Sequence, residues 1–412
     1  MRTSTGRYCI VWVVTLVATL AAVAIFDALV DPYDVIGSTR TEGFNLLKSE
    51  ADAHTRLTKP YQIERVRPGA VILGTSRAQV GLDPENRVWP EAVRPVYNFG
   101  TPGANLPTLY RELQDAGSLG SVKLAVITLD FENFLSADTK PDLTPEEDQR
   151  MLVTADGKPN TAWPPRRARD IFFATLTLGA LEDSVATIID QHKKYVPDVT
   201  PEGRWTEAAF EEAVSADGYY ELFRQKEANY AQRNAQIASK LADQPNAVAG
   251  IDVVRHMLDY CHAHGIRPLL IIPPYHADLL EIFDKAGLWA PFEDWKRDLV
   301  RLSEQYSRSG IPVPLWDFSG YDRYSTETVP AKGDRRAVVN WFWEAGHFKR
   351  ALGDLMLQRI FTGMPPDLGV ELAPDTIDRQ IEKTRVARDD YRATHNPQVA
   401  WVSEIYHHAS SR

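Results

Sequence analysis

Three side chains in this sequence have the types that nucleophilic catalysis needs: Ser76, His347 and Glu344. A serine hydroxyl is a useful nucleophile only when a base takes its proton and hydrogen-bond donors hold the oxyanion that forms. Histidine suits the base because its ordinary pKa lies near neutral pH, and a carboxylate fixes the tautomer of its ring. Glu344 precedes His347 by three residues, close enough in a turn for its carboxylate to reach the imidazole. These residue types together predict acyl transfer through a serine ester.

Other residues compete for some of these roles. His276 is the second candidate base, and for either histidine the alternative is a surface or capping residue. Asp317 is an alternative orienting acid or a substrate contact, although a turn-forming aspartate after a strand explains it equally well. Tyr275 and His276 could bind a sugar, with loop packing as the alternative. Trp341 and Trp343 could line a substrate groove, although core packing is the usual role of aromatic residues.

The candidate nucleophile follows a short apolar run, residues 70–73, in the turn Gly74-Thr75-Ser76-Arg77. Four to eight apolar residues stopped by a turn signal predict a buried strand of a parallel sheet. Two similar runs, residues 96–99 and 124–129, end in polar or glycine-rich segments of their own. In open α/β sheets ligands bind at the carboxyl ends of the strands. The three exits therefore predict one shared site around Ser76.

The segments between these runs read as helices. A helix is expected to start at Asp83 and to end at Trp89-Pro90, and another over residues 106–116 with Asn105 as its N-cap. Strands that alternate with helices predict an α/β fold built on a doubly wound parallel sheet of the flavodoxin-like type.

The core is expected in two parts, residues 69–135 and 247–364, separated by a mostly helical insertion over residues 136–246. The insertion contains no recognisable chemistry motif, so a lid, a partner surface and plain packing all stay open. The second part is expected to hold strands at 268–272 and 311–315 and helices at 248–264, 295–309 and 348–361. A charged, partly helical tail is expected over residues 365–412.

The N-terminus predicts a membrane anchor over residues 1–30, followed by a juxtamembrane segment over residues 31–68. Arg2 and Arg7 precede the uncharged residues 8–26, and three aspartates follow by position 34. As a helix, the uncharged run would be about 28 Å long, close to the thickness of a bilayer's hydrocarbon core. Positive charge before the span and acidic residues after it place the N-terminus in the cytoplasm and the main domain in the periplasm or outside the cell.

The alternative to the anchor is a signal peptide cleaved after Ala22-Val23-Ala24, which would give a secreted protein. A buried core helix is a third interpretation, disfavoured by the positive flank at the extreme N-terminus. Both main interpretations make the domain extracytoplasmic.

Composition excludes several classes of function. The formal net charge of −10 argues against a nucleic-acid partner, because binding phosphate backbones needs a basic face. Two cysteines, Cys9 and Cys261, cannot form a disulfide framework, and we expect neither to be bridged. No cysteine and histidine cluster has the spacing of a zinc site.

Three motifs resemble blocks one, two and five of the SGNH (GDSL-type) hydrolases: residues 74–77 (GTSR), 98–105 (NFGTPGAN) and 344–347 (EAGH). The resemblance implies that Ser76 is the nucleophile, that His347 is the base, and that the Gly103 N–H donates to the oxyanion. Glu344 would replace the usual aspartate as the orienting carboxylate. No metal or organic cofactor is implied.

The resemblance is incomplete at block three. The family's Gly-x-Asn should follow the third strand, where this chain has Asp130-Phe131-Glu132-Asn133. Asn133 reaches the site only if the loop is reshaped, and an ionised Asp130 cannot donate a hydrogen bond. Arg77 or Asn105 could compensate by pointing into the same crevice.

With its anchor and long insertion, the chain most resembles the SGNH-like proteins of cell-envelope polysaccharide O-acetylation, including those of the alginate system. The resemblance implies a serine esterase or O-acyltransferase whose substrate is a polysaccharide or another acylated molecule, and a membrane-bound acyltransferase is a candidate partner. The incomplete block three motivates the alternative, a non-catalytic SGNH-like envelope protein that binds glycan or such an acyltransferase. Hydrolysis and transfer both stay open.

Overall fold

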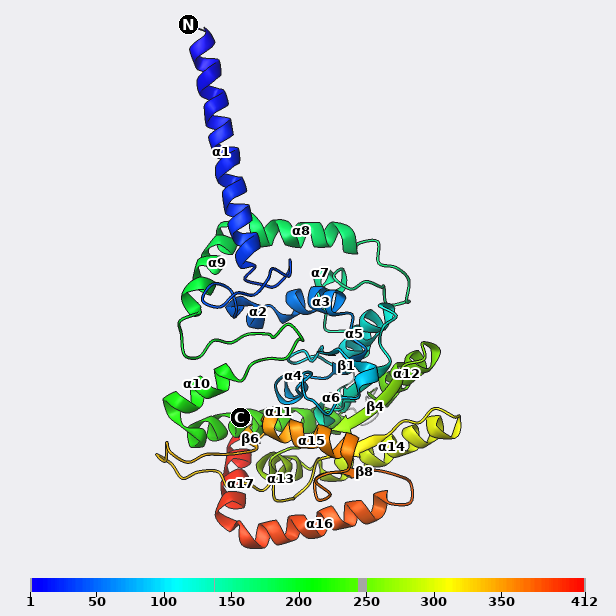
Figure 1. Cartoon of the computed structure of the whole chain (residues 1–412). Helices are drawn as coiled ribbons and strands as arrows, with labels where there is room; N and C mark the ends of the chain where they lie inside the picture. Colours follow the sequence, from blue (N-terminus) through cyan, green and yellow to red (C-terminus); the bar gives the residue numbers. More distant parts are fainter. Residues whose placement is uncertain (1, 137, 244–249, 411–412) are drawn as a thin grey trace.

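The computed structural model describes residues 2–136, 138–243 and 250–410. It is a mixed α/β protein in which a mostly parallel sheet lies among many helices, and one long apolar helix, α1 (Arg2–Val30), projects from the body (Figure 1). The predicted boundary at 246/247 and the predicted helix start at 248 lie outside the described residues.

The central sheet has six strands in the order β2-β1-β3-β4-β5-β8. The first five are parallel, and β8 runs antiparallel to β5. Their bounds are β1 (Ala70–Leu73), β2 (Val96–Asn98), β3 (Leu124–Thr128), β4 (Arg267–Ile272), β5 (Leu315–Asp317) and β8 (Val370–Glu371). β1 lies between β2 and β3, with Ala70 in register with both Val96 and Leu124. The predicted strand at 311–315 is displaced, because β5 begins only at Leu315.

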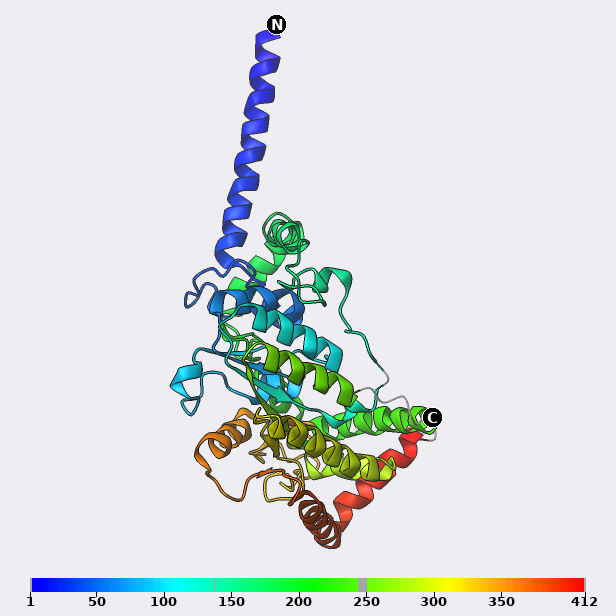
Figure 2. The same ribbon diagram turned by 90° about the vertical axis from the view of Figure 1, so that its right-hand side faces the viewer.

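Three helices form a layer against the sheet: α5 (Leu106–Ser118), α12 (Gly250–Ala263) and α14 (Trp289–Arg308). They lie side by side in Figure 2, with α12 packed between α5 and α14. α5 begins as predicted, because the Asn105 side chain accepts a hydrogen bond of 2.9 Å from the Thr108 N–H.

The helix predicted to start at Asp83 is wrong. Helix α4 (Ser76–Gly81) begins directly after the turn that follows β1, with Thr75 as its N-cap. The Asp83 carboxylate instead stabilises a turn by accepting a hydrogen bond of 2.9 Å from the Glu85 N–H. A 3-10 helix, η1 (Glu91–Val93), then leads into β2.

The segment between α6 (Phe131–Phe134) and α12 is mostly helical over its described residues. It contains α7 (Pro145–Asp148), α8 (Trp163–Thr175), α9 (Leu178–Asp190), α10 (Ala208–Asp217) and α11 (Tyr219–Asp243). The short helix α6 lies just before it, at the end of β3. α11 packs against elements from the second part of the core, so the insertion is not a separate appendage.

The C-terminal part completes the body. A hairpin of β6 (Phe342–Glu344) and β7 (His347–Phe348) precedes α15 (Arg350–Thr362), and α13 (Ala277–Lys285) follows β4. The tail is helical, with α16 (Ile377–Thr394) and α17 (Asn396–Ser410). α17 packs against α11 and α13, and the Trp401 Nε1–H donates a hydrogen bond of 3.0 Å to the buried carboxylate of Glu227.

The N-terminal helix is apolar and long enough over Gly6–Val30 to cross a membrane. The segment after it is folded onto the body and contains α2 (Ser49–Ala53) and α3 (Thr55–Val66). The Asp31 carboxylate accepts hydrogen bonds from the backbone N–H groups of residues 35–38, which fixes the exit from α1.

Candidate active site

Ser76 is the first residue of α4, at the carboxyl end of β1. The turn before it requires glycine, because a Cβ on Gly74 would lie 1.9 Å from the Thr128 hydroxyl oxygen. The Thr75 side chain caps α4, and its hydroxyl donates a hydrogen bond of 2.5 Å to Asp130. Thr75 and Arg77 are buried, whereas Ser76 between them is partly exposed. The local sequence thus presents one hydroxyl at the edge of the sheet.

The candidate base and acid lie opposite each other on the β6–β7 hairpin, where Glu344 pairs with His347 across two turn residues. One Glu344 oxygen contacts the imidazole Nδ1, and the other accepts a hydrogen bond of 2.8 Å from the Gly346 N–H. Glu344 is fully buried, while the His347 side chain is 15% exposed. The carboxylate is therefore shielded from water, and the imidazole remains partly accessible.

The two parts meet across 271 residues of sequence, with Ser76 Oγ 2.8 Å from His347 Nε2. With the Nδ1 proton directed at Glu344, the Nε2 lone pair faces the Ser76 hydroxyl. Nucleophile, base and orienting acid stand in the order that serine hydrolysis requires, within the distances expected of a nucleophile and its base. The structure thus brings together the three residues named first from the sequence.

The surroundings of Glu344 favour its charged form. Burial alone would raise the pKa of this carboxyl group, but the imidazole of His347, the Gly346 N–H and the Arg77 cation outweigh burial. The pKa of Glu344 is therefore lowered from its ordinary value. An ionised carboxylate in this position stabilises the imidazolium that forms when His347 accepts a proton.

Arg77 joins the helix that carries the candidate nucleophile to the hairpin that carries the candidate base. Its buried guanidinium donates through Nε to the Gly346 carbonyl at 2.7 Å. The other nitrogens pair with Asp130 at 2.8 Å and with Glu132 at 3.3 Å. The guanidinium nitrogens therefore donate to groups of the protein itself. Arg77 is therefore placed as a positioning residue, and Asp130 as its counter-ion.

The second motif forms a turn beside the loop that carries Ser76. The Ala104 N–H donates to the Thr101 carbonyl at 3.2 Å, and Gly103 has a positive φ of 70°, as the third residue of a type II turn requires. The Thr101 N–H donates to the Gly74 carbonyl at 2.9 Å. This bond fixes the turn next to the nucleophile loop and leaves Gly103 exposed.

The two candidate asparagines have different positions. The short helix α6 reshapes the loop after β3, and the Asn133 amide donates a hydrogen bond of 3.1 Å to the Ala104 carbonyl. Asn133 therefore does reach the turn that carries Gly103. Asn105 caps α5 with its oxygen and donates through Nδ2 to the Lys140 carbonyl at 2.9 Å, so its side chain serves the insertion and the helix end.

The remaining candidates are engaged in packing. His276 is buried at the start of α13, where its Nε2 lies 2.7 Å from the Glu327 carbonyl oxygen and burial lowers its pKa. The hydroxyl of Tyr275 is buried and accepts from the Phe131 N–H at 3.1 Å. Both residues therefore fit the packing alternative better than sugar binding.

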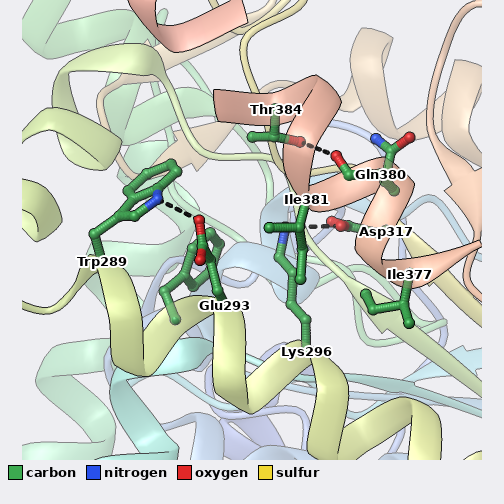
Figure 3. A pocket seen from close by; sticks show the side chains of 9 residues that line it. Trp289, Glu293, Lys296, Asp317, Ile377, Gln380, Ile381 and Thr384 are labelled. Atoms are coloured by element: carbon green, nitrogen blue, oxygen red, sulfur yellow. Dashed lines mark hydrogen bonds and ion pairs between the residues drawn. The ribbon is translucent and has the colours of Figure 1, made fainter. Parts of the chain in front are cut away.

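Asp317 lies at the end of β5 and pairs with Lys296 of α14 at 2.7 Å (Figure 3). The cavity beside this pair, between α14 and α16, measures about 10 Å³. A space of that size holds about one water molecule and no sugar. The carboxylate in contact with His347 is that of Glu344, and Asp317 is accounted for by its ion pair.

The insertion supplies two aromatic residues to the site that the sequence did not suggest. The Tyr230 hydroxyl of α11 lies 3.4 Å from a Glu344 oxygen, and a Cβ on Gly346 would come within 2.0 Å of that hydroxyl. The Phe210 ring of α10 lies 5.4 Å from the His347 ring and stacks on Trp343 at 5.5 Å. Helices α10 and α11 of the insertion therefore line the site. No local sequence motif identifies Phe210 or Tyr230.

A buried acid, Glu112, forms a hydrogen bond with the turn that contains Gly103. Glu112 of α5 accepts a hydrogen bond of 2.6 Å from the Thr101 hydroxyl, and burial raises its pKa to about 8. Lys59 of α3 donates to the Asn98 carbonyl at 3.0 Å and to the Gly100 carbonyl, and burial lowers its pKa to about 7.

We expect Glu112→Gln to remove a pH dependence of stability. Above pH 4.5, the ordinary pKa of this group, the unfolded chain releases a proton that folded Glu112 retains up to about pH 8, so the free energy of unfolding falls as pH rises. The opposing effect of Lys59 begins only at about pH 7. As pH rises from 4.5 to about 7, the free energy of unfolding of Glu112→Gln should therefore increase relative to that of the wild type. Urea unfolding of the full chain in detergent measures this free energy. Glu91→Gln, at a side chain that is 96% exposed, is the control, and parallel curves for Glu112→Gln and the wild type would contradict the assignment.

No protein-family model matches the chain, and no curated protein sequence matches it significantly. The function is therefore inferred from the motifs and from the geometry of the site.

Proposed function

We propose that this protein is an extracytoplasmic serine esterase or O-acyltransferase of the SGNH type that acts on cell-envelope polysaccharide. The observation that carries the proposal is the contact of 2.8 Å between Ser76 Oγ and His347 Nε2, with Glu344 on the other ring nitrogen. The strand order β2-β1-β3-β4-β5 supports a doubly wound, flavodoxin-like sheet. In such sheets the carboxyl ends of the strands, where Ser76 lies, form the ligand site.

In the proposed reaction Ser76 Oγ attacks the acyl carbonyl carbon while His347 Nε2 accepts the hydroxyl proton. The Ser76 N–H, which as the first amide of α4 has no acceptor within its helix, and the Gly103 N–H would hold the oxyanion. The leaving alcohol takes the proton from His347, and the acyl group remains on Ser76 as an ester. Water or a sugar hydroxyl then attacks that ester and gives its proton to His347, which passes it to Ser76 Oγ as the acyl group leaves as a free acid or a new sugar ester.

The proposed location follows from α1 and its flanking charges. The end of α1 belongs to the folded body, because Asn45 donates to the Leu29 carbonyl at 2.9 Å and Lys48 donates to the Val30 carbonyl at 2.5 Å. Both contacts lie after Ala24 and would survive cleavage there, so the anchor is favoured instead by the apolar run, which continues past that site through Ile25 and Phe26. We therefore place the N-terminus in the cytoplasm and the body on the outer side of the membrane.

A serine-directed fluorophosphonate tests the proposal. The full chain in detergent should be labelled, with the label on the peptide that contains Ser76. Ser76→Ala should lose the label and His347→Ala should lose most of it. Ser215→Ala, at an exposed serine of α10, should label like the wild type. A folded wild-type protein that resists the probe would favour the non-catalytic alternative, for which the incomplete third motif is the argument.

A further inference from the structure

Helix α8 buries two charged side chains and exposes large apolar side chains near its C-terminal end. Arg166 and Asp170 are buried and paired with each other. Four large apolar side chains at the corner between α8 and α9 are exposed, by 52%, 46%, 37% and 86% for Phe172, Phe173, Leu176 and Leu178. A surface helix in water shows the opposite pattern, and a contiguous exposed apolar patch marks an interaction site. We call these four residues the α8–α9 corner.

The corner lies where the anchor meets the body. α1 packs against both α8 and α9, and its partly covered side chains begin at Val23 and Ala24. These two residues belong to the uncharged run that ends at Phe26. The part of the body that covers Val23 and Ala24 must therefore lie at the depth where the hydrocarbon core of the bilayer ends.

The orientation of α8 fits that depth. Figure 1 shows α8 running across the base of α1, and Figure 2 shows the same helix end-on beside it, so the two axes are nearly perpendicular. A helix perpendicular to a membrane-spanning helix lies parallel to the bilayer surface. Amphipathic helices in this orientation bury their apolar face at the boundary of headgroups and acyl chains.

The corner is held in place by bonds to the juxtamembrane segment. The Gln191 side chain, at the end of α9, accepts from the Leu47 N–H at 3.0 Å and donates to the Leu47 carbonyl at 2.8 Å. Arg167 of α8 pairs with Glu64 of α3 at 2.5 Å, and Tyr33 donates to Asp183 of α9. The apolar side chains therefore stay at the base of the anchor.

We propose that the α8–α9 corner inserts into the leaflet in which α1 ends, so that the body is seated on the bilayer and not merely tethered to it. Continuity with α1 favours lipid as the occupant. The exposed Arg169, whose guanidinium lies 5.5 Å from the Phe173 ring, is placed to meet lipid phosphates beside the inserted ring. The inference uses the membrane anchoring proposed above and is independent of the esterase chemistry.

Spin labels on the full chain test the proposal in liposomes of phosphatidylcholine and phosphatidylglycerol. Leu178→Cys and Phe172→Cys would each be made in a Cys9→Ser background. Burial raises the pKa of the Cys261 thiol to about 12, which keeps that residue unlabelled. Dissolved oxygen, which concentrates in lipid, should relax both labels more than a water-soluble nickel chelate. A label at Val338→Cys, a position that is 72% exposed, should show the reverse.

Stronger relaxation by nickel at both corner positions would overturn the proposal. Protection from both reagents would also overturn it, because it would mean that a second copy or another protein covers the corner. A label at Val17→Cys, in the middle of the uncharged run of α1 and in the same Cys9→Ser background, separates these outcomes from a failure of the anchor itself. Nickel access at Val17→Cys would refute the membrane-spanning α1, whereas oxygen access there with nickel access at Leu178→Cys refutes only the seating of the corner.

Discussion

Replacing His347 by alanine is expected to lower kcat/KM for an activated ester such as p-nitrophenyl acetate by about 10⁴-fold or more. Without the imidazole nothing takes the proton of the Ser76 hydroxyl, which lies 2.8 Å from Nε2 in the wild type. Ser76→Ala and the double variant should show nearly the same loss, because residues that act as a unit have non-additive effects. Initial rates with the full chain in detergent measure the effect.

Glu344→Gln should also cost about 10³- to 10⁴-fold. The amide is close in shape to the carboxylate, but its NH₂ group can donate to Nδ1 and so place the ring proton on Nε2, facing Ser76. Glu304→Gln, on the surface of α14, is the matched control. A wild-type rate for Glu344→Gln would contradict the role of Glu344 as the carboxylate that orients the ring.

Arg77→Met is expected to lower the free energy of unfolding by about 3–5 kcal/mol, because it leaves Asp130 buried without its counter-ion and leaves Glu132 paired only with Arg233 at 3.6 Å. The same variant should lower kcat more than it changes KM, since the lost bond of 2.7 Å to the Gly346 carbonyl holds the hairpin that carries His347. Urea unfolding followed by tryptophan fluorescence gives the first quantity, and steady-state kinetics give the second.

A matched control uses Arg297→Met. Arg297 also pairs with two aspartates, but at the surface, where such pairs contribute about 0–1 kcal/mol. Adding Asp130→Asn and Glu132→Gln to Arg77→Met should restore much of the stability but not kcat, because the hairpin contact stays absent. An Arg77→Met protein as stable as the wild type would show that the buried carboxylates are compensated in another way.

The parts of the site that the sequence predicts are those with a local signal. The runs that became β1, β2 and β3 are short, apolar and followed by small or polar turns, so strand ends could be located without a structure. Glu344 and His347 lie three residues apart, and their contact needs only one turn. The contact of this hairpin with Ser76 was implied by the resemblance of the motifs and not by local spacing, because the hairpin belongs to a separate two-stranded sheet.

The parts that were missed depend on contacts between distant segments. Tyr230 reaches Glu344 across 114 residues, from a helix whose sequence shows only amphipathic spacing. The two residues of β8 pair with β5 from a segment expected to be a tail. The predicted helix start at Asp83 was wrong because the helix begins earlier, directly after β1, where Thr75 is its N-cap. Arg77 was proposed as a compensating group in the oxyanion site because the sequence alone does not show that its guanidinium pairs with Asp130 and Glu132.

The separation of 271 residues between Ser76 and His347 has a consequence for biosynthesis. Chains emerge from the ribosome amino end first, so the serine leaves long before its base exists. α11, which places Tyr230 beside Glu344, also packs against α17, a helix that is synthesised after His347. A nascent chain that lacks His347 therefore carries Ser76 without its candidate base, so the proposed site can form only after residue 347 has been synthesised.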